Sequence, residues 1–285
     1  MNVSGGQSLS APDQPPGWSA NLSLQFAVKG SRTIIAGKSF QGPLAVQKPF
    51  YPEGGTCHVY VLHPPGGVVG GDQLAIDLTL QESSHALVTT PAANKFYRSD
   101  KRSSRLLQSL SLQQEAMLEW LPQESIYFDQ CNTRINTRIE LASHSKLIAW
   151  DMICLGRPAS GETFAQGAIR QTLEIKQRGR VLLNDRLLIE GSSPMLSESW
   201  GFHGYGVIGY LVATPATPDI RDKVREIAGF EKSVRLTTTL IDGLLICRVL
   251  ADKAELARRK LIKVWQLIRP EIMAKEAIQP RIWHT

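Results

Sequence analysis

The sequence predicts a mainly β protein made of layered or coiled sheets, and three observations lead to this fold class. Apolar and polar residues alternate from Leu22 onward, which is the pattern of a half-buried strand. Similar short segments follow at close spacing and are joined by Gly, Pro, Asn and Ser. Helical patterns do not alternate with these segments, as they would in an α/β fold. No sequence repeat indicates a solenoid.

Most of the chain is predicted to form short strands. In chain order they cover residues 22–28, 32–36, 56–62, 74–80, 85–90, 105–112, 117–121, 134–141, 146–153, 169–176, 181–190, 206–213, 234–239 and 244–250. Two helices are predicted in the last third of the chain, over 218–228 and 252–269. The second is expected to begin with a capping box, Asp252 and Glu255, and to end before Pro270.

The chain is expected to form one domain over residues 22–285, because 285 residues with 42% hydrophobic content can bury a large core. Residues 1–21 are polar and rich in Pro and Gly, so they are expected to form a disordered tail. That segment has no apolar run typical of a signal peptide, and no run elsewhere approaches the ~20 residues that span a bilayer. We therefore expect a soluble, cytoplasmic protein without a membrane partner.

Cysteine and charge content exclude several classes of site. The four cysteines lie apart in apolar segments without a CxxC pair, which favours buried, reduced thiols over structural zinc. The net charge of +6 is a modest bias for a chain of this length. Nucleic-acid binding is not expected, because the basic residues are spread along the chain and only residues 95–98, KFYR, combine cations with aromatic rings.

The segment HPPGGVVGGD, residues 63–72, is the most unusual in the chain. Its prolines exclude helix and its glycines allow positive φ, while Val68 and Val69 favour burial, so a tight, packed turn is predicted. The turn presents His63 and Asp72 at its two ends. It lacks the P-loop ending and the GxGxxG spacing, and a strand follows it, so a phosphate loop is not expected. A rigid hairpin with a partly buried histidine is the purely structural alternative.

A second polar position lies in WDMICLGRPASGETFAQG, residues 150–167. Asp151 falls inside an apolar strand, where a carboxylate needs a partner, a hydrogen bond or a polar cavity to stay charged. The simplest structural interpretation is an ion pair between Asp151 and Arg157. Glu162 lies in the Gly/Pro-rich turn that follows.

Several of these segments together resemble one known family. HPPGGVVGGDQL, TTPAANKFYRS, WLPQESIYFD, WDMICLGRPASGETF and PRIW occur in this order between residues 63 and 283, and they look like the motifs of the urease accessory protein UreD, called UreH in some bacteria. The resemblance implies a mainly β fold of helically wound, stacked sheets with a pair of C-terminal α-helices.

The resemblance also implies a function. UreD-like proteins are non-enzymatic maturation factors that bind apo-urease and recruit a UreF-like accessory protein and a UreG-like GTPase. The complex delivers nickel to the urease active site, and the metal is thought to pass through a polar internal tunnel. No permanently bound cofactor is expected, only transient Ni²⁺.

Residue types and motif positions suggest where these roles lie. A transit path needs oxygen or imidazole ligands that exchange quickly, since thiolates would trap the ion. The metal-path candidates are Asp72 and Asp151, followed by Glu53, Glu190, His63 and Glu162. The candidate partner-binding residues are Lys95, Phe96, Tyr97, Arg98, Phe128 and Trp283.

One enzymatic alternative remains open at this point, a metal-dependent hydrolase with a site around His63 and Asp72. The six histidines never form HxH or HExxH, and GxSxG is absent. Catalytic residues are therefore not expected.

Overall fold

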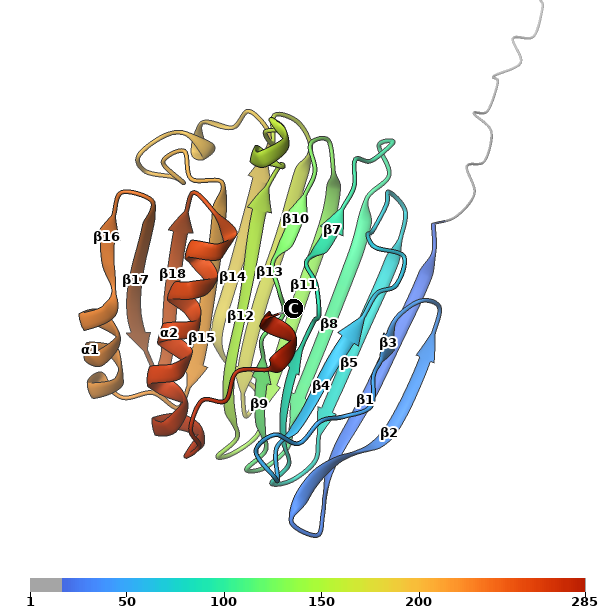
Figure 1. The fold of residues 1–285 in the computed structure, drawn as a ribbon, viewed down its shortest axis with the longest axis vertical. Coiled ribbons are helices and arrows are strands. Elements are labelled where there is room, and N and C mark those ends of the chain that lie inside the picture. The colour runs from blue at the N-terminus through green and yellow to red at the C-terminus, as the bar shows by residue number, and fades with distance from the viewer. Residues whose placement is uncertain (1–16, 285) are drawn as a thin grey trace, which may run out of the picture.

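Two β-sheets form the body of the protein. The computed structural model describes residues 17–284, without the side chains of Phe230 and His284. Within these residues, a seven-stranded sheet (sheet I) has the order β14-β13-β11-β8-β5-β1-β2. An eleven-stranded sheet (sheet II) has the order β16-β17-β18-β15-β12-β9-β6-β4-β3, and in addition β10 pairs with β12 and β7 pairs with β10. Figure 1 shows the strands running side by side, with α2 lying across sheet II.

The strand bounds are as follows. Sheet I contains β1 (Ser19–Lys29), β2 (Arg32–Gln41), β5 (Gln73–Leu80), β8 (Ser104–Leu112), β11 (Asn132–Leu141), β13 (Ala168–Gln177) and β14 (Arg180–Glu190). Sheet II contains β3 (Ala45–Val46), β4 (Cys57–Leu62), β6 (His85–Thr89), β7 (Asn94–Phe96), β9 (Met117–Trp120), β10 (Ser125–Tyr127), β12 (Lys146–Leu155), β15 (Val207–Thr214), β16 (Gly229–Glu231), β17 (Val234–Ile241) and β18 (Leu244–Ala251).

The chain winds helically between the sheets from β4 to β13. Each coil passes through sheet II by one strand or by two short ones, as in β6–β7 and β9–β10, and then through one strand of sheet I. Successive coils pair in parallel within both sheets. The corners at one end repeat a single geometry: Ser83, Glu115 and His144 each lie three residues after a strand of sheet I and have φ of 57°, 57° and 59°. The predicted mainly β, helically wound fold is confirmed.

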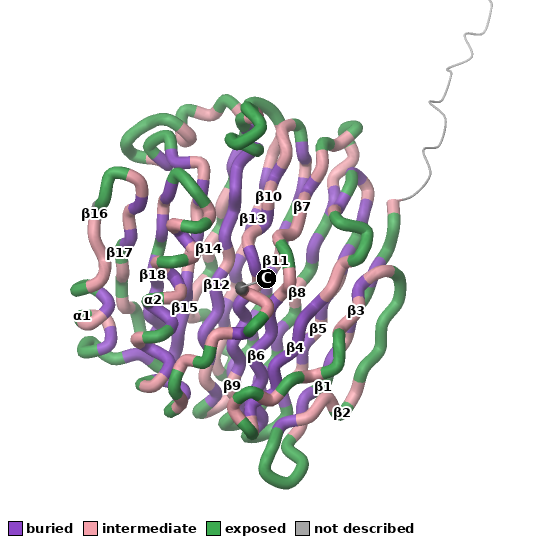
Figure 2. The backbone as a smooth tube through the Cα atoms, in the orientation of Figure 1, coloured by how far each residue is buried: buried purple, intermediate pink, exposed green. Residues whose placement is uncertain are grey.

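The core lies between the sheets, and a second apolar cluster lies outside sheet II. Strand β12 contributes to both clusters, because its side chains point alternately to its two faces. Leu147, Ala149 and Ile153 face sheet I, while Ile148 and Trp150 face the helices. Helix α2 (Ala254–Met273) packs on β12, β15 and β18, and helix α1 (Pro218–Ile227) packs on α2 and β17. Figure 2 shows this pattern as buried segments running through the middle of both sheets.

Three local predictions differ from the structure. Strand β1 begins at Ser19, so residues 19–21 belong to the fold, whereas 1–16 lie outside the described residues. Helix α2 begins after Lys253 without a side-chain cap and continues through Pro270 to Met273. Proline removes one helical hydrogen bond, and burial of Ile272 and Met273 offsets this cost. No helix among the described residues is long and apolar enough to span a membrane.

The segment 63–72 is a crossing between layers and not a hairpin. It joins β4 of sheet II to β5 of sheet I, which are strands of different sheets. Val68 is buried as predicted, but Val69 is 46% exposed, so the prediction of burial is wrong for this residue. Only one of the two valines can point inward, because consecutive side chains of extended backbone point in opposite directions.

Candidate functional site

The unusual sequence segments meet at one end of the molecule. Residues 63–72, 90–103, 121–131 and 156–167 all lead from sheet II to sheet I, so the winding stacks them beside one another. Short pairings hold the stack in register: Val68 bridges Phe96, Phe96 pairs with Tyr127, and Tyr127 pairs with Leu155. The motifs therefore form one continuous surface, which we call the crossover end.

The glycines of 63–72 permit close packing at this end. A Cβ on Gly67 would lie 2.2 Å from the ring of Tyr97, and Gly71 has φ of +94°. Asp72 closes the segment, because its two carboxylate oxygens accept hydrogen bonds from the backbone N–H groups of Val69 and Trp18, both at 2.9 Å. Asp72 thus fixes the backbone of the crossing.

A cavity of about 650 Å³ lies between the sheets behind the crossover end. Its wall combines apolar side chains of both sheets, such as Trp120 and Ile135, with a few polar groups. The polar and ionisable residues that line it include His63, Asn94, Lys95, Gln108, Gln123 and Asp151. Sparse polar groups in an apolar wall are typical of sites for small ligands.

Asp151 is the acidic group of this wall. It is on β12 and points between the sheets, because its neighbours Trp150 and Met152 face the helices. Gln171, from the opposite sheet, donates a hydrogen bond to one carboxylate oxygen, and the backbone N–H of Met152 donates to the other. Burial raises the pKa of Asp151 to about 6, although these two hydrogen bonds lower it.

The expected ion pair between Asp151 and Arg157 is wrong. Arg157 instead binds Glu162 on the surface, with Nη2 and Oε2 2.6 Å apart. The hydrogen bonds from Arg157 lower the pKa of Glu162. The two residues also form a β-bridge that closes their own turn. Arg157 therefore makes its ion pair within this turn and not with the buried Asp151.

His63 supplies an imidazole to the same cavity. Its Nδ1 is buried without a hydrogen-bond partner. Burial lowers the pKa of His63, while the negative charge of Asp72 opposes this effect. A neutral imidazole with an unused nitrogen can act as a metal ligand or as a hydrogen-bond partner of a passing ligand.

The other predicted metal-path residues lie outside the cavity wall. Asp72 is bound to the backbone, Glu162 to Arg157, and Glu53 to Arg269, whereas Glu190 is exposed at the end of β14. Within residues 17–284, no three His, Cys, Asp or Glu side chains are grouped so that they could hold a metal ion. The described cysteines are free and buried, and burial raises the pKa of Cys131 and Cys154 to about 12.

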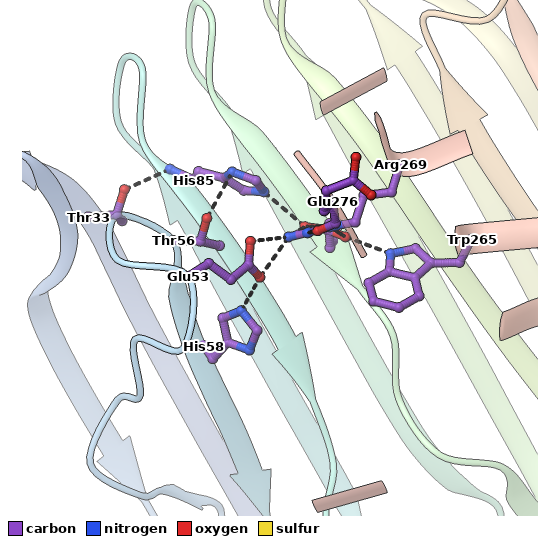
Figure 3. A network of polar contacts seen from close by, with 9 residues as sticks. Thr33, Glu53, Thr56, His58, His85, Trp265, Arg269 and Glu276 are labelled. Atoms are coloured by element: carbon purple, nitrogen blue, oxygen red, sulfur yellow. Dashed lines mark hydrogen bonds and ion pairs between the residues drawn. The ribbon is translucent and has the colours of Figure 1, made fainter. Parts of the chain in front are cut away.

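A second buried polar cluster, missed by the sequence analysis, lies between sheet II and α2 (Figure 3). Arg269 of α2 is fully buried and donates hydrogen bonds to the carboxylates of Glu119 on β9 and Glu53 before β4, at 2.8 to 3.1 Å. His85 contacts Glu119 at 2.9 Å and His58 contacts Glu53 at 2.5 Å. The cluster therefore joins three early coils to the last helix.

The two acids of this cluster are ionised. Burial alone would raise the pKa of Glu119, but His85 and Arg269 lower it to about 2. At Glu53, too, burial alone would raise the pKa, but the contacts with His58 and Arg269 lower it. The indole N–H of Trp265 donates a further hydrogen bond to Glu119 at 2.7 Å. Each buried charge thus has several partners, as a stable buried ion pair requires.

Comparison with known proteins then identifies the family. The model of the family described as UreD urease accessory protein matches residues 19–284. The chain belongs to the UreD family of urease accessory proteins. It is 42% identical to the urease accessory protein UreD of Klebsiella aerogenes over 96% of this chain and 99% of that protein. It is 44% identical to the Citrobacter koseri protein of the same name, over 94% and 92% of the two chains.

The crossover end of this UreD-family chain also holds most of the predicted partner-binding residues. Tyr97 and Phe128 form an edge-to-face pair with centroids 4.8 Å apart, and the guanidinium of Arg157 lies 4.3 Å from the centroid of the Phe128 ring. Arg98 is exposed and Lys95 is half-buried. These residues lie next to one another at the surface.

Two other candidates have internal contacts. Phe96 is only 1% exposed and stacks on Tyr127 at 4.7 Å, so in this structure it packs the core and presents no surface to a partner. Trp283 packs against Trp150 and Trp265, and its indole donates to the hydroxyl of Thr89. Trp283 therefore packs the C-terminal segment against sheet II and α2.

Proposed function

We propose that this protein matures urease as a scaffold that also conducts nickel. Membership of the UreD family supports a role in urease maturation. The names of the relatives describe accessory proteins and not enzymes, which agrees with the absence of catalytic motifs from the sequence. In the proposed complex the chain binds apo-urease, a UreF-like protein and a UreG-like GTPase in the cytoplasm.

The single observation that carries the conducting role is the carboxylate of Asp151 in an internal cavity. The carboxylate is held by neutral donors, so a cation entering the cavity competes with hydrogen bonds and not with an ion pair. Carboxylate and imidazole ligands bind Ni²⁺ but release it more readily than a thiolate cage. We therefore narrow the proposed path to Asp151 and His63.

A pKa of about 6 also suits a transfer step. Near neutral pH most Asp151 side chains are ionised and can take up a divalent cation, while protonation favours its release. A group that is ionised near neutral pH and can be protonated favours passage of the ion over its storage.

The crossover end is the proposed docking surface for the accessory proteins. Tyr97, Phe128, Arg98 and Lys95 lie there beside the cavity. Aromatic residues and arginine are enriched in protein interfaces. A partner bound at this surface would lie over the space lined by His63 and Asp151.

The test compares Asp151→Ala with a matched control, Asp252→Ala, which removes an exposed acid before α2. Each variant is co-purified with the UreF-like and UreG-like partners, and the nickel content and activity of the urease that it matures are measured. We expect both complexes to assemble and only Asp151→Ala to yield nickel-poor urease. Full activation by Asp151→Ala, or loss of assembly, would refute the conducting role.

A further inference from the structure

Three arginines form a row across the outer face of sheet I. Arg105 of β8 pairs in register with Arg134 of β11, and Arg134 pairs with Arg170 of β13. Their neighbours along each strand face the core, so the alternation of side chains points all three arginines outward. Neighbouring strands are about 4.8 Å apart, so the row extends over about 10 Å.

No ion pair neutralises this row. Among the described residues, no carboxylate forms an ion pair with any of the three guanidinium groups, and Arg170 donates only to the side-chain oxygen of Asn132, at 3.4 Å. The next outward positions on β11 and β13, Asn136 and Thr172, are neutral. Glu190 on the edge strand β14 lies diagonally from Arg170 but forms no ion pair with it in the described part of the chain. Like charges placed opposite one another on adjacent strands destabilise a sheet. The row therefore weakens the isolated fold unless something binds it.

The surroundings of the row indicate a protein ligand. A groove of about 360 Å³ lies beside it, lined by Arg105 and Arg134 together with the amides of Gln73 and Asn136. Leu107 borders the groove and is 45% exposed. Arginine beside an exposed apolar residue is typical of protein interfaces, and its planar group binds carboxylates with two hydrogen bonds.

Other anionic ligands fit the face less well. The described lining of the groove contains no aromatic ring on which a base could stack, which single-stranded nucleic acid would require. Four residues further along the strands the same face has mixed charge, because Asp77 and Glu174 lie on either side of Arg138. A phosphate backbone or an anionic membrane that continued past the row would therefore meet no further run of positive charge.

We propose that the outer face of sheet I binds a carboxylate-rich segment of a partner protein through Arg105, Arg134 and Arg170. Carboxylates two residues apart in an extended segment are separated by about 6.8 Å, so the row accommodates two or three of them. This surface lies on the opposite side of sheet I from the cavity. The inference is therefore independent of the nickel path.

The direct test uses the full-length chain and a labelled peptide of about ten residues with alternating Glu and Ser, which places its acids on one side of an extended strand. Binding is followed by fluorescence anisotropy at about 50 mM salt. The row variant R105Q/R134Q/R170Q is compared with R180Q/R225Q/R259Q. The control removes the same charge from exposed arginines that pair with Asp242, Asp222 and Glu255.

We expect the row variant to bind the acidic peptide about tenfold more weakly or worse, and the control to stay within about twofold of the parent chain. The charge-reversed variant R105E/R134E/R170E should lose the acidic peptide and bind a Lys/Ser peptide instead. The row variant should melt at the same or a higher temperature than the parent, because a repulsion is removed.

Three results would overturn the proposal. The first is no binding of the acidic peptide by the parent chain. The second is an equal loss of binding in the row variant and the control, which would indicate net charge alone. The third is tighter binding of single-stranded DNA or of vesicles with anionic lipid through the same arginines.

Discussion

The buried Arg269 cluster gives the sharpest prediction for stability. Arg269→Met keeps the apolar stem of the side chain but removes the guanidinium that binds Glu119 and Glu53. The two carboxylates are then left in positions where their side chains are 0% and 5% exposed. Removing one partner of a buried ion pair costs about 3–5 kcal/mol. We expect the free energy of unfolding to fall by this amount.

The control for this change is Arg259→Met on the same helix. Arg259 pairs with Glu255, and both side chains are more than half exposed, so the loss should be at most about 1 kcal/mol. A rescue variant that adds Glu119→Gln and Glu53→Gln to Arg269→Met removes the stranded charges and should recover part of the stability. Urea unfolding followed by tryptophan fluorescence measures all three. Equal losses in the Arg269 and Arg259 variants would refute the reasoning.

Further predictions concern three carboxylates. The pKa of Glu119 is lowered to about 2, so its ion pairs stabilise the fold above pH 4.5, and this contribution is lost as pH falls from 4.5 toward 2. A urea unfolding midpoint that stays constant over that pH range would contradict this prediction. The pKa of Asp151 is raised to about 6, so its ionisation destabilises the fold as pH rises through 6. Asp151→Asn should therefore gain stability over the parent chain between pH 4 and 8, by at most about 3 kcal/mol, and a gain that is the same at both ends would argue against it. Asp72→Ala should cost about 1–3 kcal/mol, because it leaves the N–H groups of Val69 and Trp18 without their acceptor; limited proteolysis should then cut within 63–72, and unchanged resistance would count against this role.

Much of the fold could be predicted because strand patterns are local. Alternation in 74–80 and 134–141 marked the faces of β5 and β11 correctly, since each inward position is buried by the opposite sheet. The short strands β7 and β10 were missed, because each pairs only with a neighbouring coil and carries no pattern of its own. The winding depends on how successive coils stack on one another. The alternation of apolar and polar residues within a strand does not indicate this stacking.

The site was only partly predictable for the same reason. A carboxylate inside an apolar strand, as at Asp151, can be recognised from one segment alone, and in the structure Asp151 lines the cavity. The cluster at Arg269 gave weaker signals: an arginine that continues the apolar face of α2 beyond Trp265, and a glutamate between two residues that face the core. Neither signal indicates which residue forms the ion pair, since Arg269 lies 150 residues from Glu119 and 216 from Glu53 along the chain.

That separation has a consequence for synthesis on the ribosome. At about 5–20 residues per second, the 150 residues between Glu119 and Arg269 take roughly 8–30 s to be made. Throughout this interval the early coils hold Glu119 without the guanidinium that stabilises it when buried, and the outer face of sheet II lacks its helix. We therefore expect the nascent chain to stay loosely packed on this side and to depend on chaperones until residue 269 has been made and has left the ribosome.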